Sequence, residues 1–240
     1  MYSYNGPVFG SYRRTEAEVR KLIPIAYSAG IRRFDTAFLY RNDNTVAEML
    51  REYPDAHLTT KIWYQHIRNA DRDNRSIVNS IVPGARTVLL HVPEKNFEIA
   101  WEQLRAVEEK YIIGVSNFNV EQIERLSSKP TVNQIEHNLF NWCDETVAYC
   151  HQQGIVVECH SVLAKAELLD AEPLVRAAKA YQMTPAQCMI AFTVQNHCVP
   201  VFSSGDPSHI AEIATVPRRR VEIDVWCNLR YRTHPKYVVN

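Results

Sequence analysis

The sequence predicts an α/β protein with a (β/α)8 TIM-barrel fold, formed by a single domain over residues 1–240. Three observations lead to this prediction. Strand-like and helix-like segments alternate along the whole chain, which indicates a parallel sheet. Eight strand-like segments can be counted, the number that closes such a barrel. An open doubly wound sheet is the alternative, but its usual G-x-G-x-x-G fingerprint is absent and the chain has only seven glycines.

The first half of the chain contains four strand-helix units. A short strand is expected at residues 7–10. Thr15 and Glu18 form a capping box for the helix that follows, and Gly30 ends that helix. The other strands expected in this half are 31–36, 57–63 and 87–91, and the other helices are 42–52, 97–109 and a poorly amphipathic one at 69–82.

The second half repeats the pattern of strand followed by helix. Its expected strands are 111–116, 131–136, 155–159 and 199–202, and its expected helices are 120–127, 144–153, 172–181, 185–196 and 207–214. Gly154 ends one of these helices, and Pro185 occupies the first turn of another.

Composition excludes several classes of function. Formal net charge is zero and the sequence pI is about 7.1, so neither a nucleic-acid nor a membrane surface is expected as partner. No run of eighteen apolar residues occurs, and residues 1–6 lack the features of a secretory signal. The six cysteines form no C-x-x-C pair. We therefore expect a cytoplasmic monomer with reduced thiols that acts on a small molecule.

Four side chains at the ends of neighbouring expected strands form a plausible proton-handling set. Asp35 ends one strand, with Tyr40 just beyond it, while Lys61 and His91 end the next two. Chemistry in such barrels is found at the carboxyl ends of the strands. A tyrosine pKa near 10 is high for a proton donor, and we expect the Lys61 ammonium to lower it. Asp35 would hold Lys61, and His91 would orient a substrate oxygen.

The chain resembles the aldo-keto reductase superfamily, as a shortened and divergent member whose loops over the barrel are shorter than the family's. The resemblance is carried in order by GIRRFDTA with Tyr40, TKIW, LLHVP, IGVSNF, VNQIEH and VPVF, at residues 30–37, 60–63, 89–93, 113–118, 132–137 and 199–202. It implies reduction of an aldehyde or ketone to an alcohol with NADP(H), or alternatively NAD(H), as cofactor. Asp35, Tyr40, Lys61 and His91 then resemble the catalytic tetrad, with Tyr40 as the general acid.

The resemblance also implies binding residues. Ser116, Asn117 and Gln134 match positions that hold the nicotinamide carboxamide, a group whose donors and acceptor suit amide side chains. The full implied cofactor set is Ser11, Ser116, Asn117, Gln134, His160, Ser161, Leu163, Lys165, Ser203, Ser204, His209 and Glu212. The implied substrate contacts are Tyr12, Trp63 and Val92. No metal ligands are implied, because Glu136 and His137 lack an evident third partner.

Several positions depart from the family pattern. His160 stands where many members stack a tyrosine on the nicotinamide, and residues 161–166 lack the usual glycines. Ser203 and His209 occupy the positions of a lysine and an arginine that hold the 2′-phosphate of NADP. Arg218, Arg219 and Arg220 are candidate substitutes for those cations. NADPH is therefore expected to be only modestly preferred over NADH.

Two further functions stay open at this point. The altered stacking position and the short loops suit a cofactor-binding regulatory or interaction protein that kept the barrel with little turnover. A metal-dependent barrel hydrolase is a more distant alternative. The short loops also suggest an open pocket, since mouth loops confer selectivity in this fold.

Overall fold

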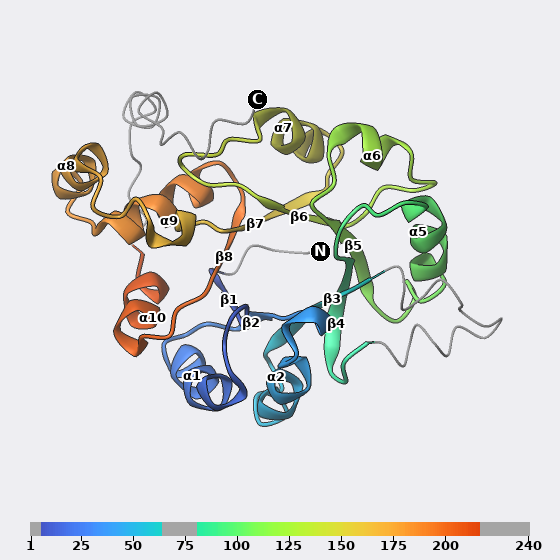
Figure 1. Ribbon diagram of the computed structural model, residues 1–240, viewed down its shortest axis with the longest axis horizontal. Helices are drawn as coiled ribbons and strands as arrows, with labels where there is room; N and C mark the ends of the chain where they lie inside the picture. The colour runs from blue at the N-terminus through green and yellow to red at the C-terminus, as the bar shows by residue number, and fades with distance from the viewer. Residues whose placement is uncertain (1–5, 64–80, 217–240) are drawn as a thin grey trace.

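The computed structural model describes residues 6–63 and 81–216, and its strands form a closed parallel barrel. Each strand pairs with the next in sequence, and β8 closes the barrel on β1 (Figure 1). The strands are β1 (Val8–Gly10), β2 (Arg33–Asp35), β3 (His57–Ile62), β4 (Ala85–Leu90), β5 (Ile112–Ser116), β6 (Val132–Glu136), β7 (Val156–His160) and β8 (Val199–Phe202). The predicted (β/α)8 fold is confirmed.

The helices surround this barrel (Figure 1). They are α1 (Glu16–Ser28), α2 (Asp43–Leu50), α5 (Phe97–Arg105), α6 (Val120–Glu124), α7 (Asp144–Gln152), α8 (Glu172–Ala180), α9 (Pro185–Gln195) and α10 (Pro207–Ala214), with short 3₁₀ turns η1 (Phe38–Tyr40) and η2 (Ala164–Ala166). The expected helix at 69–82 lies almost wholly outside the described residues. None of the described helices is long and apolar enough to cross a membrane.

Local sequence signals explain where several helices begin. Thr15 accepts a hydrogen bond from the Glu18 backbone at the start of α1, and the Glu18 carboxylate accepts one from the Thr15 backbone. The same reciprocal arrangement links Thr184 and Gln187 at the start of α9. These capping boxes satisfy backbone N–H groups that the first helical turn leaves without partners, so the helices start at fixed residues.

Successive side chains of β2 point alternately to the outside and to the inside of the barrel. Phe34 packs in the hydrophobic core between strands and helices. Its neighbours Arg33 and Asp35 are also buried, and they hydrogen-bond to side chains of β7 and β6 across the barrel. Successive side chains of a strand point to opposite faces, so these two project into the barrel interior. Charged groups thus lie inside the barrel, close beneath its mouth.

The expected strands differ from the observed ones mainly at their ends. The fourth strand was expected at 87–91 and runs from Ala85 to Leu90, so His91 follows it directly. The five cysteines among the described residues are free thiols, as expected. Cys227 and the basic run 218–220 lie outside the described residues.

Candidate active site

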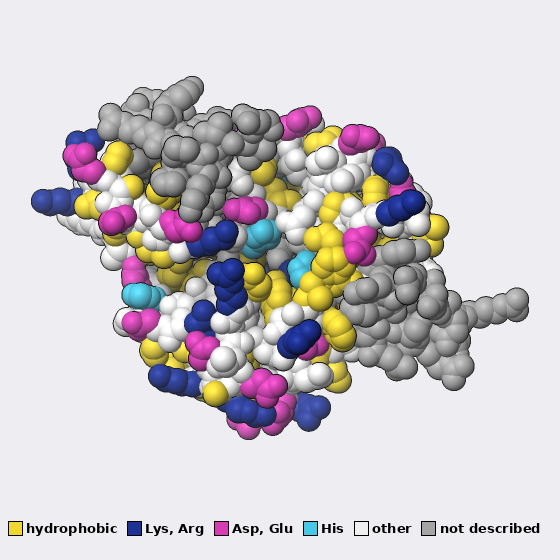
Figure 2. Space-filling model, in the orientation of Figure 1, with side chains coloured by type: hydrophobic (Ala, Val, Ile, Leu, Met, Phe, Trp, Pro, Cys, Tyr) yellow, Lys and Arg dark blue, Asp and Glu magenta, His cyan; other side chains and the backbone are white. Residues whose placement is uncertain are grey.

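A cavity of about 530 Å³ opens at the carboxyl ends of the strands. Gly10, Asp35, Ser116, His160 and Phe202 are each the last residue of a strand, and all line it. Figure 2 shows basic and histidine side chains around the hollow at the centre of this face. The other lining residues are Tyr12, Arg13, Arg14, Tyr40, Lys61, His91, Asn117, Gln134, Ser161, Val162, Leu163, Lys165, Ala166, Val201 and Ser203.

Lys61 joins Asp35 to Tyr40 at the base of this cavity. Its Nζ donates to Asp35 Oδ1 at 2.5 Å and to Tyr40 Oη at 3.3 Å. A third hydrogen bond goes to the Thr36 carbonyl oxygen at 3.2 Å, so the ammonium uses all three donors. The η1 turn after β2 carries Tyr40 back over the strand end, which explains how residues five apart meet the same lysine.

The pKa directions of this group differ in part from expectation. Burial raises the pKa of Tyr40, and although the Lys61 ammonium opposes this shift, the net direction is upward. Lys61 thus acts on the pKa of Tyr40 in the expected direction, but desolvation, which the sequence interpretation did not include, outweighs it. For Lys61, burial alone would lower the pKa, but the Asp35 and Tyr40 oxygens raise it overall. At neutral pH the ammonium and the phenol are thus both protonated.

His91 stands beside Tyr40 with its rings in an edge arrangement, 5.9 Å between centroids. Burial and the Lys61 charge lower the pKa of His91 to about 3, so its imidazole is neutral at physiological pH. Its Nδ1 is buried, and no hydrogen-bond partner for it lies among the described residues. A proton on Nε2 instead gives His91 one N–H to donate at the cavity.

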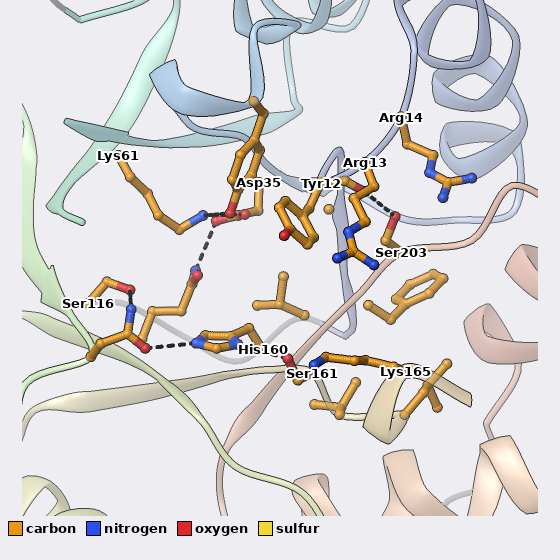
Figure 3. A pocket seen from close by; sticks show the side chains of 18 of the residues that line it. Tyr12, Arg13, Arg14, Asp35, Lys61, Ser116, His160, Ser161, Lys165 and Ser203 are labelled. Carbon is orange, nitrogen blue, oxygen red and sulfur yellow. Dashed lines mark hydrogen bonds and ion pairs between the residues drawn. The ribbon is translucent and has the colours of Figure 1, made fainter. Parts of the chain in front are cut away.

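His160, Asn117 and Ser116 form a chain of hydrogen bonds between the ends of β7 and β5. Figure 3 shows His160 and Ser116 among the side chains that line the cavity. His160 Nε2 lies 2.9 Å from Asn117 Oδ1, and His160 Nδ1 lies 3.1 Å from Ser161 Oγ. Since an amide oxygen only accepts, His160 carries its proton on Nε2 and accepts from Ser161 at Nδ1. Burial, with the Lys61 charge, lowers the pKa of His160 to about 4, so this ring is neutral too. Asn117 Nδ2 donates to Ser116 Oγ at 3.1 Å.

Two cations face the other end of the cavity. Arg13 follows β1, and Lys165 lies in η2 after β7. Figure 3 shows both side chains entering the cavity on the side away from Lys61. Arg14 also lines the cavity, but its Nη1 is paired with Glu18 at 2.9 Å. Anionic groups of a ligand would therefore meet Arg13 and Lys165 first.

Comparison with known proteins decides the family. The model of the Aldo/keto reductase family matches residues 8–226. The chain belongs to the aldo/keto reductase family. It is 26% identical to the aldehyde reductase YPR1 of Saccharomyces cerevisiae, over 87% of this chain and 82% of that one. It is 30% identical to a 9,11-endoperoxide prostaglandin H2 reductase of Trypanosoma cruzi, over 82% of this chain and 76% of that one.

A solved structure adds to this comparison. A mutant of Gox0644 in complex with NADPH superposes with a TM-score of 0.87 at 25% identity, covering 97% of this chain and 91% of that one. Aldo/keto reductases are NAD(P)H-dependent oxidoreductases that reduce carbonyl groups, and this chain is an enzyme of that class.

In this aldo/keto reductase the structure brings most of the predicted site residues to one cavity. Nine of the predicted positions join the tetrad there. They are Tyr12, Ser116, Asn117, Gln134, His160, Ser161, Leu163, Lys165 and Ser203. Ser203 also donates to the Tyr12 carbonyl oxygen at 3.3 Å, which ties the β8 end to the turn after β1.

Six other predicted residues are not among those lining the cavity. Ser11 is buried, and its hydroxyl instead hydrogen-bonds with Thr36 Oγ1 and Asn42 Oδ1, both at 2.9 Å, with the amide oxygen of Asn42 as an acceptor. Glu212, in α10, accepts a hydrogen bond from Thr184, the N-cap residue of α9. Ser204 and His209 are linked to each other at 3.5 Å on the β8–α10 loop and helix. Trp63 and Val92 follow β3 and β4, and Trp63 packs on His91 at 5.8 Å.

The sequence interpretation missed four charged residues at or beneath the site. Arg13 and Arg14 were overlooked, although a basic pair directly after the first strand turn is a readable signal. Arg33 and Glu158 were overlooked as well, although charges inside strand patterns are unusual. Among residues 6–63 and 81–216, no group of three His, Cys, Asp or Glu side chains is arranged to hold a metal ion.

Proposed function

We propose that this enzyme reduces an aldehyde or ketone to an alcohol with NADPH, and that Tyr40 donates the proton. The observation that carries the proposal is Lys61 donating at once to Asp35, at 2.5 Å, and to Tyr40, at 3.3 Å, beneath the cavity. A phenol that loses its proton at this position leaves an oxygen anion facing a fixed ammonium. Carbonyl reduction requires such a donor at the moment when negative charge develops on the substrate oxygen.

The residues at the inner end of the cavity fit a nicotinamide. Ser116 and Gln134 line it beside the tetrad and offer hydroxyl and amide groups to a carboxamide. The His160 ring, neutral and held by Asn117, is the flat group available for stacking. When bound, the reduced nicotinamide supplies the hydride for the substrate carbon. Asn117 has both its amide nitrogen and oxygen engaged within the protein, so it acts by fixing Ser116 and His160.

The residues at the outer end fit the phosphates of a dinucleotide. Arg13 and Lys165 both line the cavity there, and neither has a carboxylate partner within salt-bridge distance among the described residues. We assign Arg13 and Lys165 together to the phosphate groups of the cofactor, namely its pyrophosphate and its 2′-phosphate. Ser203 lines the same region, whereas His209 lies outside it. The NADPH complex of Gox0644 supports NADP(H) as the cofactor, with NAD(H) as the alternative.

Proton handling then falls to four residues. Because burial raises the pKa of Tyr40, the phenol is protonated before the reaction at neutral pH. Tyr40 donates this proton to the substrate oxygen, and Lys61 stabilises the phenolate that remains. Asp35 keeps Lys61 charged and in place. His91, neutral and with its N–H on Nε2, donates to the same substrate oxygen and orients the carbonyl.

Exposed aromatic and aliphatic side chains suggest the substrate class. Tyr12 is 53% exposed and stands 5.0 Å from the Tyr40 ring, measured between centroids. Phe38 and Leu39, in the η1 turn that carries Tyr40, are each 43% exposed. Tyr12 also lines the cavity, and an exposed aromatic ring beside the proton donor favours aldehydes or ketones with a hydrophobic or aromatic group.

Titration calorimetry with NADPH and NADH, followed by assays on aromatic and aliphatic carbonyls, tests the proposal. We expect NADPH binding, consumption of NADPH with an aldehyde, and an alcohol as product. Binding of NADPH without turnover of any carbonyl would favour the regulatory or interaction protein instead. Absence of binding of both nucleotides would contradict the proposal.

A further inference from the structure

A buried ion pair lies inside the barrel close to the proposed reduction site. Arg33 Nη2 of β2 stands 2.5 Å from Glu158 Oε1 of β7, with 7% and 0% of the two side chains exposed. The interiors of such barrels are usually filled by branched apolar side chains. Because apolar side chains of similar volume would often serve stability as well as a buried ion pair, the pair invites a functional explanation.

The ion pair is connected to the site through one amide. Gln134 Nε2 donates to Glu158 Oε2 at 2.9 Å and to Asp35 Oδ2 at 2.9 Å. A side-chain amide nitrogen has two hydrogens, and both are used here. Both carboxylate oxygens act as acceptors here, so it is the nitrogen of Gln134 that faces them. Its oxygen Oε1 is then the part of the amide left for a ligand in the cavity that Gln134 lines.

We propose that Arg33 and Glu158 are positioning residues that fix the Gln134 amide so that it offers the cofactor an acceptor only. The inference rests on the proposed function, since it deepens the assignment of Gln134 to the nicotinamide carboxamide. Gln134 accordingly accepts an N–H from the carboxamide and cannot donate to the carboxamide oxygen. Arg33 acts through Glu158, whose carboxylate it holds in place.

Strand register explains why Glu158 holds this amide. Gln134 and Glu158 are paired residues of β6 and β7, so their side chains enter the interior at the same level. Asp35 reaches the amide from β2, on the other side of the barrel. Turning the amide over would place its oxygen against two carboxylates and leave those acceptors without hydrogens. Two carboxylates enforce the orientation more strongly than Asp35 alone.

A nicotinamide analogue gives a direct test that needs no turnover. In 3-acetylpyridine adenine dinucleotide phosphate a methyl group replaces the carboxamide nitrogen, so the analogue has no N–H to donate. Calorimetry with oxidised NADP and with this analogue gives a ratio of dissociation constants for each protein. For the wild-type chain we expect the analogue to bind about tenfold more weakly, the effect of one lost hydrogen bond.

The decisive variant is Arg33→Met/Glu158→Met, which removes both charges together and so leaves neither uncompensated. With the amide freed to turn over, we expect the ratio to fall to about threefold or less. Glu158→Gln is the second variant, for use if the first does not fold. The amide introduced there has both a donor and an acceptor, so it permits either orientation of Gln134, and the ratio should also fall. The matched control is Arg20→Gln/Glu48→Gln, which removes an exposed ion pair between α1 and α2 and should keep the wild-type ratio.

The outcomes separate this inference from the proposed function. Failure of the wild-type chain to bind NADP would overturn the proposed function, and the inference with it. A Gln134→Met variant should bind the analogue and NADP with similar affinity. A wild-type ratio of the two dissociation constants in that variant would overturn the carboxamide contact on which the inference rests. If Gln134→Met loses the discrimination while folded Arg33→Met/Glu158→Met and Glu158→Gln keep the wild-type ratio, the positioning role alone is overturned.

Discussion

Lys61 and Asp35 form an ion pair that is almost completely closed to solvent, with 1% and 3% of the two side chains exposed and 2.5 Å between Nζ and Oδ1. Because both side chains are shielded from solvent, water cannot solvate either charge if its partner is removed. Desolvation raises the pKa of Asp35, while Lys61 and Gln134 oppose that shift. The same ion pair therefore contributes to the stability of the barrel and holds Lys61 in place at the candidate active site.

Breaking this pair should destabilise the protein more than removing it. We expect Lys61→Met to cost about 3–5 kcal/mol of unfolding free energy, because a buried carboxylate is left without its cation. The double variant Lys61→Met/Asp35→Leu should recover most of that loss. Urea denaturation of the single and double variants measures both values. A double variant less stable than Lys61→Met would show that the pair itself, not the orphaned charge, dominates.

Acidification should destabilise the fold through half-buried histidines that are neutral in the folded state, of which His160 is one. The folded-state pKa of His160 is about 4, below the unfolded value of about 6.5. The unfolded chain thus takes up the proton first, and the stability present above pH 6.5 is lost as pH falls toward 4. Between pH 7 and pH 5, His160→Phe should lose about 1–2 kcal/mol less unfolding free energy than the wild-type chain. Equal losses in urea titrations at the two pH values would contradict this.

The cations of the outer cavity should control nucleotide affinity. Arg13→Ala and Lys165→Ala should each weaken NADPH binding by about tenfold at low salt, and each should reduce its salt dependence. Arg176→Ala is the control, because this exposed arginine of α8 pairs with Glu172 and does not line the cavity. Calorimetry at two salt concentrations makes the comparison. If all three substitutions weakened NADPH binding equally, the assignment of Arg13 and Lys165 to the phosphates would be contradicted.

The close approach of neighbouring strands leaves little room for a side chain at Gly114 of β5. A Cβ at this position would lie 2.5 Å from the Val132 carbonyl oxygen and 2.7 Å from Leu89 Cδ2. We expect Gly114→Ala to cost about 1–3 kcal/mol, since the backbone of β6 must move. At Gly205 the nearest atom is the flexible end of Arg14, so Gly205→Ala should cost much less. Similar urea midpoints for the two variants would contradict the steric argument.

Sequence patterns predicted the barrel because strand and helix periodicities are local properties. The same patterns placed Asp35, Lys61 and His91 at strand ends, and parallel strands bring such ends to one rim. The Arg33–Glu158 pair escaped prediction, since which side chains meet across a barrel depends on closure and register. The raised pKa of Tyr40 escaped prediction for a different reason, because desolvation depends on a burial that no local pattern encodes.

Glu212 illustrates the remaining limit of sequence interpretation. Its cofactor contact stays a prediction, while the structure shows that Thr184, the N-cap residue of α9, donates a hydrogen bond to its carboxylate. Gln187 of the same helix donates to the Glu212 carbonyl oxygen at 3.1 Å. The packing of α9 against α10 therefore decides what Glu212 contacts, and the sequence around Glu212 carries no trace of that packing.

Proton donation by Tyr40 is tested most directly by single-turnover reduction of an aromatic aldehyde by the enzyme preloaded with NADPH. Tyr40→Phe keeps the ring that packs against Tyr12 and removes only the hydroxyl that Lys61 binds. We predict that the variant binds NADPH within about threefold of the wild-type affinity and that its rate of NADPH oxidation falls by about 10²–10⁴-fold. A variant that oxidises NADPH at the wild-type rate would contradict the account.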